Sequence, residues 1–158
     1  MTQTEPHRLE VVGEHAAGLL ADIHTEAFDA PWTEEQLARS LDGPGAYAIM
    51  AWRGDRPAGF VIGRAMAGEA EIITLAVRPA DRRQGLGRVL MDAAVDTALA
   101  FDATVMFLEA AVDNTAAVAL YASVGFQAAG RRKQYYARAG GPRIDALIMR
   151  RALNTKAS

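Results

Sequence analysis

The sequence of 158 residues contains no cysteine. A chain without thiols forms no disulfide, offers no thiolate to a metal ion and cannot carry an acyl group on a cysteine. Its histidines, His7, His15 and His24, are not grouped in the way that metal ligands are. We therefore expect no metal site, and we expect the three histidines to occupy ordinary surface or helix positions.

Charge of one sign is not in excess either. The 17 lysine and arginine residues stand against 19 aspartate and glutamate residues, which gives a formal net charge of −2. This balance provides no electrostatic reason to bind nucleic acid or an anionic membrane. The sequence also lacks an apolar run close to the ~18 residues of a membrane-spanning helix, and its polar opening does not resemble a secretory signal. We expect a cytoplasmic protein with no nucleic-acid partner and no membrane partner.

What the chain does contain is an alternation of strand and helix patterns over a length suited to one domain, residues 1–158. Three strands in close succession favour an antiparallel meander. Thr33 and Gln36 form a capping-box pattern at the start of the second expected helix. The expected fold class is therefore α/β, with a mixed, largely antiparallel sheet flanked by helices. The expected strands cover residues 8–13, 46–52, 58–66, 70–78, 104–111, 126–136 and 143–151, and the expected helices cover residues 14–28, 33–41, 85–101 and 114–124.

A glycine-containing turn with nearby arginines precedes the third expected helix. The first N–H groups of a helix have no partner within it, and the helix dipole adds partial positive charge, so such a turn attracts an anion such as phosphate. Gly85 and Gly87 would let a pyrophosphate approach the backbone, and Arg82, Arg83 and Arg88 would add positive charge. The alternative is a tight turn beside a solvated arginine face. The third glycine of the dinucleotide fingerprint and the Gly-Lys-Ser/Thr of a P-loop are both missing.

The segment from Val77 to Gly87 resembles motif A of the GNAT acetyltransferase superfamily, whose pattern Q/R-x-x-G-x-G/A is met by Arg82, Gly85 and Gly87. In that family the turn binds the pyrophosphate of coenzyme A, and the strand before it pairs with the pantetheine arm. The resemblance implies the GNAT fold and acetyl-CoA as co-substrate. The coenzyme-binding residues that it implies here are Leu75, Ala76, Val77, Arg82, Arg83, Gln84, Gly85, Leu86, Gly87 and Arg88.

A second segment, from Leu108 to Phe126, carries groups suited to acetyl transfer. The reaction needs a group that accepts the proton of the amine and a group that protonates the departing thiolate. Glu109 lies in an apolar strand, where an unpaired charge is costly, and Tyr121 follows on the next helix. The segment resembles motif B of GNAT enzymes, in particular the bacterial ribosomal-protein-alanine N-acetyltransferases. That resemblance implies Glu109 as catalytic base, Tyr121 as catalytic acid and Asn114 as a coenzyme A-binding residue.

Each of these residues also has a purely structural interpretation. Tyr121 could be an ordinary buried helical tyrosine, Asn114 could be only a helix N-cap, and Glu109 could be paired with an arginine. Glu71 offers a rival base, because the histone lysine acetyltransferases of the same superfamily place their base at the matching position. Either carboxylate could act, or the two could share a water molecule.

The acceptor is the part of the function with most alternatives. The resemblance implies a protein N-terminus, with ribosomal proteins among the candidates, that attacks acetyl-CoA directly in a ternary complex. Ala111 stands where the ribosomal-protein-alanine subfamily usually has arginine, which leaves open a small-molecule amine as acceptor. A non-catalytic acetyl-CoA-binding regulatory module is the other alternative. Tyr135 and Tyr136 could pack the strand or form a wall of the acceptor site.

Overall fold

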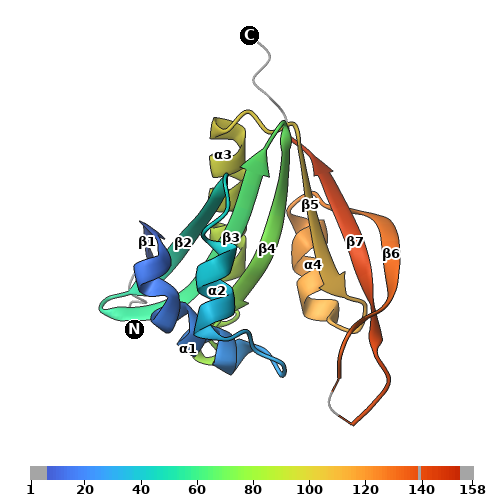
Figure 1. Ribbon diagram of the computed structural model, residues 1–158, viewed down its shortest axis with the longest axis horizontal. Coiled ribbons are helices and arrows are strands. Elements are labelled where there is room, and N and C mark those ends of the chain that lie inside the picture. The colour runs from blue at the N-terminus through green and yellow to red at the C-terminus, as the bar shows by residue number, and fades with distance from the viewer. Residues whose placement is uncertain (1–6, 139, 154–158) are drawn as a thin grey trace.

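The computed structural model describes residues 7–138 and 140–153. Seven strands form one sheet in the order β1-β2-β3-β4-β5-β7-β6 (Figure 1). The chain order and the mixed, largely antiparallel sheet predicted from the sequence are confirmed, and element ends lie within two residues of the expected ones, except that α1 begins three residues later because Glu14–Ala16 form a 3-10 turn. The strands are β1 (His7–Val12), β2 (Ala46–Arg53), β3 (Arg56–Met66), β4 (Glu69–Val77), β5 (Val105–Ala111), β6 (Gln127–Tyr136) and β7 (Ile144–Ala152). The helices are α1 (Ala17–Ala27), α2 (Glu34–Ser40), α3 (Leu86–Ala100) and α4 (Thr115–Ser123), with 3-10 turns at Glu14–Ala16 and Pro79–Asp81.

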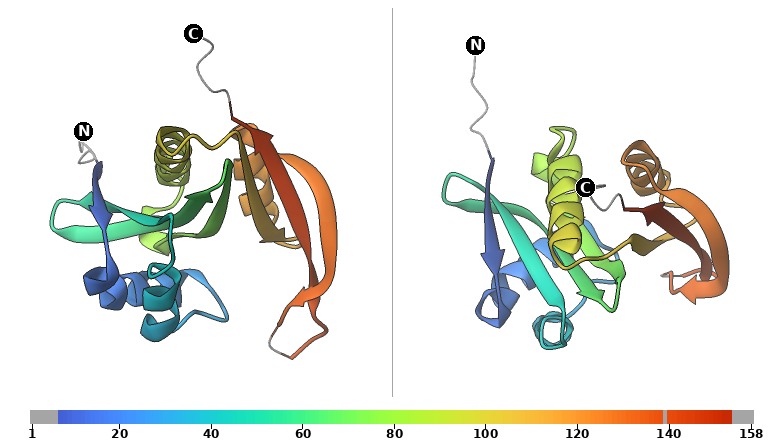
Figure 2. Two further views of the ribbon diagram at one scale, coloured as in Figure 1. Left: turned by 45° about the horizontal axis from the view of Figure 1, so that its top comes forward. Right: turned by 90° about the horizontal axis from the view of Figure 1, so that it is seen from above.

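Helices cover both faces of the sheet, and each face has its own apolar core. Helices α1 and α2 lie on one face, and α3 and α4 lie on the other (Figure 2). Strand β3 is buried on both sides, because Phe60 and Ile62 join the core under α1 and α2 while Val61 joins the core under α3. Because side chains alternate along this strand, it contributes residues to both apolar cores.

Strands β4 and β5 are parallel neighbours that pair over only a short stretch. The pairs join Glu69–Glu71 to Val105–Phe107, and the described residues form no further pair between these strands. Beyond that point the two strands separate (Figure 1). Strand β4 also carries a bulge, because its register with β3 passes from Thr74 to Ile72 and leaves Ile73 as an extra residue. The part of β4 after Glu71 thus has a backbone edge with no strand partner on the side of β5.

No helix in the described part of the chain is long and apolar enough to cross a membrane. The same residues contain no group of three or more histidine, aspartate or glutamate side chains that could hold a metal ion.

Candidate active site

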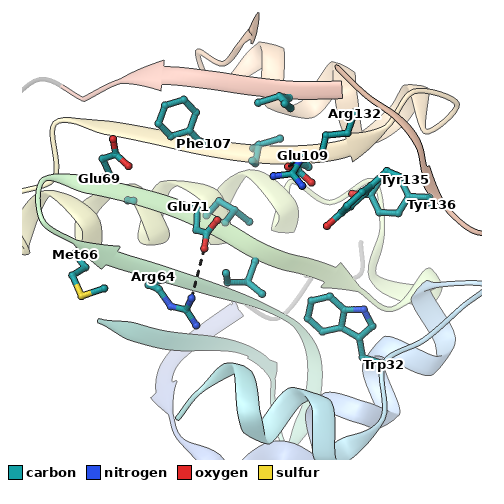
Figure 3. Close-up of a pocket in the computed structure, with 15 residues that line it drawn as sticks. Trp32, Arg64, Met66, Glu69, Glu71, Phe107, Glu109, Arg132, Tyr135 and Tyr136 are labelled. Atoms are coloured by element: carbon teal, nitrogen blue, oxygen red, sulfur yellow. Dashed lines mark ion pairs between the residues drawn. The ribbon is translucent and has the colours of Figure 1, made fainter. Parts of the chain in front are cut away.

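A cavity of about 610 Å³ opens where β4 and β5 separate (Figure 3). Its wall combines carboxylates, arginines and aromatic rings from strands that are far apart in the sequence. The side chains that Figure 3 labels are Trp32, Arg64, Met66, Glu69, Glu71, Phe107, Glu109, Arg132, Tyr135 and Tyr136. The cavity therefore brings Glu109 together with its rival Glu71 and with both tyrosines of β6.

Glu109 faces this cavity because of the alternation along β5. Its neighbours Leu108 and Ala110 are buried in the core under α3 and α4, so the side chain between them points to the other face. The Glu109 side chain is 25% exposed, and its Oε1 lies 2.6 Å from Nε of Arg132. The arginine pairing of the structural interpretation is therefore present, the carboxylate lines the cavity at the same time, and its role as base stays a prediction.

Glu71 lies at the last β4–β5 pair, opposite Phe107. Its side chain is half-exposed, and its Oε1 is 3.8 Å from Nη1 of Arg64, a looser ion pair than that of Glu109. Glu109 is two residues beyond Phe107 along β5, so it lies within the region where the strands have separated. Both carboxylates line one cavity. Of the two, only Glu109 lies where β5 is no longer paired with β4.

Tyr121 lies on the other side of the sheet. It belongs to the core under α3 and α4, packs edge-on against Phe126 with ring centroids 6.3 Å apart, and does not line the cavity. Burial, with the neighbouring Tyr136, raises the pKa of Tyr121 to about 12, so its hydroxyl is protonated at neutral pH. Within the described residues that hydroxyl makes no hydrogen bond. Glu109 and Tyr121 are thus on opposite faces at the β4–β5 separation.

Tyr135 and Tyr136 form an aromatic wall at one end of the cavity, with their rings edge-on at 5.0 Å. Burial raises the pKa of Tyr136 to about 12, and the charge of Glu109 adds to this shift. Of the two interpretations open for these tyrosines, a place on the cavity wall agrees with the geometry.

The turn before α3 presents a row of backbone donors. The N–H groups of residues 83–88 have no acceptor in the described part of the chain. Arg83 and Gly85 both have positive φ, of 63° and 77°, a conformation in which successive N–H groups can converge on an anion. Arg82 donates to Val77 O at 3.2 Å, and Arg88 lies 3.5 Å from Ser123 O. The predicted anion-binding turn is thus exposed, and two of its arginines are oriented by backbone carbonyls.

Three predicted coenzyme residues have structural roles as well. The side chain of Leu86 is buried in the core, so only its backbone faces the turn. A Cβ on Gly87 would lie 2.9 Å from Leu120 Cδ2, so glycine there permits close packing of α3 on α4. Asn114 is the N-cap of α4 and accepts from Ala117 N at 3.2 Å, which confirms its structural interpretation while its coenzyme role stays a prediction.

Asp81 supports the anion-binding turn, a role that the sequence motifs do not indicate. Its side chain is completely buried in the 3-10 turn that precedes the anion-binding turn. Nη2 of Arg56 lies 2.7 and 2.8 Å from its two oxygens, and Nη1 of Arg53 lies at 3.5 Å. Asp81 therefore holds the turn onto the β2–β3 hairpin. No local pattern indicates this, because the partners are 25 or more residues away.

His24 occupies a helix position, one of the two expected for the histidines, because it lies on α1. It is nevertheless buried, with only 2% of it exposed. Its Nδ1 accepts from Trp32 N at 3.0 Å, and its Nε2 is 3.2 Å from Thr74 Oγ1. The signal was present in the sequence, since His24 lies four residues after the buried Leu20 and so falls on the inner stripe of the helix.

Comparisons with known proteins agree with this geometry. The acetyltransferase (GNAT) family model matches residues 18–126. The N-alpha-acetyltransferase RimI of Mycobacterium tuberculosis is 35% identical over 154 residues, with 94% of both chains covered. The ribosomal protein bS18-alanine N-acetyltransferase of Escherichia coli is 35% identical over 127 residues, which cover 80% of this chain and 84% of that protein. The crystal structure of the ribosomal-protein-alanine N-acetyltransferase from Escherichia coli matches with a TM-score of 0.89 and 28% identity over 97% of both chains. The chain therefore belongs to the acetyltransferase (GNAT) family, has the GNAT fold and is an acetyl-CoA-dependent N-acetyltransferase.

Proposed function

We propose that this enzyme acetylates the N-terminal α-amine of a protein. The amine attacks the acetyl group directly, while acetyl-CoA is bound where β4 and β5 separate. The observation that carries this proposal is the two-sided arrangement at that point. The anion-binding turn and Tyr121 lie on the side of α3 and α4, and the cavity with Glu109 lies on the other. One substrate on each side brings an amine and an acetyl group together without a covalent enzyme intermediate.

The residues of the α3 side fit the coenzyme. The N–H groups of residues 83–88, which have no acceptor among the described residues, suit a pyrophosphate, and Arg82, Arg83 and Arg88 supply positive charge nearby. The unpaired edge of β4 at Leu75, Ala76 and Val77 offers backbone groups to the amides of a pantetheine arm. Gln84, Gly85, Leu86, Gly87 and Asn114 complete the proposed coenzyme site.

The residues on either side of the separation fit the two proton transfers. Glu109 would accept the proton of the amine, directly or through water. Tyr121 would donate its proton to the departing thiolate. Its pKa of about 12 keeps the hydroxyl protonated at neutral pH, and among the described residues this hydroxyl has no hydrogen-bond partner. An α-amine, with a pKa of ~7.7–8.0, is partly neutral near pH 7. A base removes its proton more easily than the proton of a lysine amine, whose pKa is ~10.4.

The shape of the cavity supports a polypeptide acceptor. Trp32, before α2, and the pair Tyr135 and Tyr136, on β6, are aromatic walls contributed by well-separated segments. Both bacterial relatives described above are named as N-acetyltransferases, one for an N-alpha position and one for an alanine of a ribosomal protein. We therefore propose a ribosomal protein with N-terminal alanine as the first acceptor to test.

The decisive assay offers three acceptors to the purified enzyme with acetyl-CoA. One is a peptide with a free N-terminal alanine, the second is the same peptide with a blocked N-terminus and an internal lysine, and the third is a panel of small amines. Acetylation of the first peptide alone supports the proposal. Preference for a small amine would overturn it, and coenzyme binding without turnover on any acceptor would favour a regulatory module. Mass spectrometry of cellular protein N-termini, with and without the gene, then identifies the natural acceptor.

A further inference from the structure

The imidazole of His24 makes two hydrogen-bonding contacts from inside the protein. Its Nδ1 accepts from the backbone N–H of Trp32 at 3.0 Å. A neutral imidazole carries one hydrogen, so the hydrogen is on Nε2, which therefore donates to Thr74 Oγ1 at 3.2 Å. Phe28 stacks on the ring at 4.2 Å and Trp32 at 5.2 Å. The ring is thus fixed in orientation and in its pattern of donor and acceptor.

These contacts connect the two substrate sides of the proposed site. Trp32 lines the cavity, whereas Thr74 immediately precedes the proposed coenzyme edge of β4 at Leu75. In the part of the chain that the structure describes, the bond from Trp32 to His24 is the one hydrogen bond that residues 29–32 make. The position of the Trp32 wall therefore depends on His24 more than on any other polar contact.

We infer that His24 is a positioning residue for the acceptor, which holds the Trp32 wall at a set distance from β4. The inference rests on the proposed function, because it takes the cavity as the acceptor site. Burial lowers the pKa of His24 to about 4, so the ring stays neutral and Nδ1 remains an acceptor throughout the neutral pH range. A phenylalanine or leucine would fill a core position equally well, yet neither would bind the Trp32 N–H.

The test compares His24→Leu with His24→Asn. The Asn side-chain oxygen is the same number of bonds from the backbone as Nδ1 and can accept from Trp32 N–H, whereas leucine leaves that donor unpaired. Loss of this bond should raise the KM of the acceptor peptide roughly 10-fold in His24→Leu. The KM of acetyl-CoA and kcat should stay within about twofold, and His24→Asn should recover most of the loss.

Thr25→Val is the matched control. Thr25 is next to His24 but exposed, and its hydroxyl donates to Ala21 O of its own helix at 2.8 Å. This variant should keep all kinetic constants. Binding of coenzyme A by titration calorimetry verifies that each variant is folded. An unchanged acceptor KM in folded His24→Leu would overturn the inference, and so would equal changes in both KM values or equal behaviour of the leucine and asparagine variants.

A second readout does not depend on which amine is the acceptor. The chain has two tryptophans, so Trp52→Phe leaves Trp32 as the sole tryptophan, whose emission is followed by selective excitation of the indole. In that background, His24→Leu should make Trp32 at least about twofold more accessible to acrylamide quenching, and His24→Asn should not. Unchanged quenching in both variants refutes the positioning role. If peptide acetylation fails in the wild type but quenching responds as expected, the proposed acceptor is wrong and the role of His24 stands.

Discussion

Tyr121 and Glu109 occupy opposite faces of the sheet, so different variants test them separately. The Tyr121 side chain is largely buried, and its hydroxyl is protonated at neutral pH and makes no hydrogen bond among the described residues. Glu109 is partly exposed in the cavity and paired with Arg132. If the two residues act as acid and base, removing one should impair its own proton transfer and leave the other side of the site unchanged.

Tyr121→Phe removes one hydroxyl and little packing volume. We expect kcat to fall roughly 10²–10⁴-fold, because protonation of the thiolate is lost, with coenzyme affinity nearly preserved. Steady-state kinetics and coenzyme titration measure the two effects. Tyr47→Phe is the control, since Tyr47 is also buried but donates to Ala94 O at 2.9 Å, away from the cavity. Comparable rate losses in the two variants would indicate a packing effect rather than acid catalysis.

Glu109→Gln and Glu71→Gln identify the base. The neutral amide cannot accept the proton of the amine, so we expect Glu109→Gln to lower kcat/KM and to recover part of the loss at higher pH, where more of the amine is neutral. Glu71→Gln should keep nearly full rate. The pH profile of kcat/KM measures both. A full-rate Glu109→Gln beside an impaired Glu71→Gln would assign the base to Glu71, and full rates in both would mean that the amine arrives already neutral.

The lowered pKa of the buried His24 predicts that the stability of the fold depends on pH. Its pKa is about 4 in the folded protein and about 6.5 in the unfolded chain, so the unfolded state takes up the proton first as the pH falls. Stability is therefore full above about pH 6.5 and decreases toward pH 4, by roughly 2 kcal/mol at about pH 5. Urea unfolding at several pH values measures this. His24→Leu should lose less stability over the same interval, and an unchanged slope would contradict the assignment.

At the scale of elements, the turn between β4 and α3 combines a strained backbone with exposed donors. Gly85 has φ of 77° as the N-cap of α3, and a Cβ there would meet no atom within 4 Å. A substitution at this glycine therefore costs backbone strain without a clash inside the protein. Its remaining effect must come from what approaches the turn from outside.

Gly85→Val should cost roughly 1–2 kcal/mol of folding stability from the positive φ and weaken coenzyme A binding at least about tenfold by obstructing the backbone. Gly68→Val is a matched control, because Gly68 has φ of 84° and equally open surroundings but lies in the β3–β4 turn. It should lose similar stability and keep its coenzyme affinity. Calorimetric titration measures the coenzyme A affinity of both variants. Equal affinities would show that the turn at Gly85 does not bind the coenzyme.

At the scale of the whole molecule, the absence of cysteine and the two-sided site predict a sequential mechanism. The chain has no thiol to carry the acetyl group, and the proposed substrates approach from opposite faces of the sheet. Initial-rate plots should intersect, and incubation with radiolabelled acetyl-CoA alone should leave no label on the protein. Parallel plots together with a kinetically competent acetyl-enzyme would refute direct transfer.

The features that the sequence alone determined are those encoded within a few residues or a short repeat. The capping box at Thr33 and Gln36 forms as predicted. The strand and helix order follows from local hydrophobic periodicity, and the positive φ at Gly85 agrees with a glycine-specific turn. The resemblance to the GNAT family follows from motifs of this kind.

Only the tertiary structure decided which distant groups meet. The buried Asp81 finds Arg56 and Arg53 across a hairpin, His24 joins Trp32 to Thr74, and Glu109 pairs with Arg132. The separation of β4 and β5, which puts Glu109 and Tyr121 on opposite faces, is likewise a property of strand pairing. The physical reason is that burial and ion pairing depend on contacts between segments tens of residues apart, whereas periodicity, capping and turn preference act within a single turn or strand.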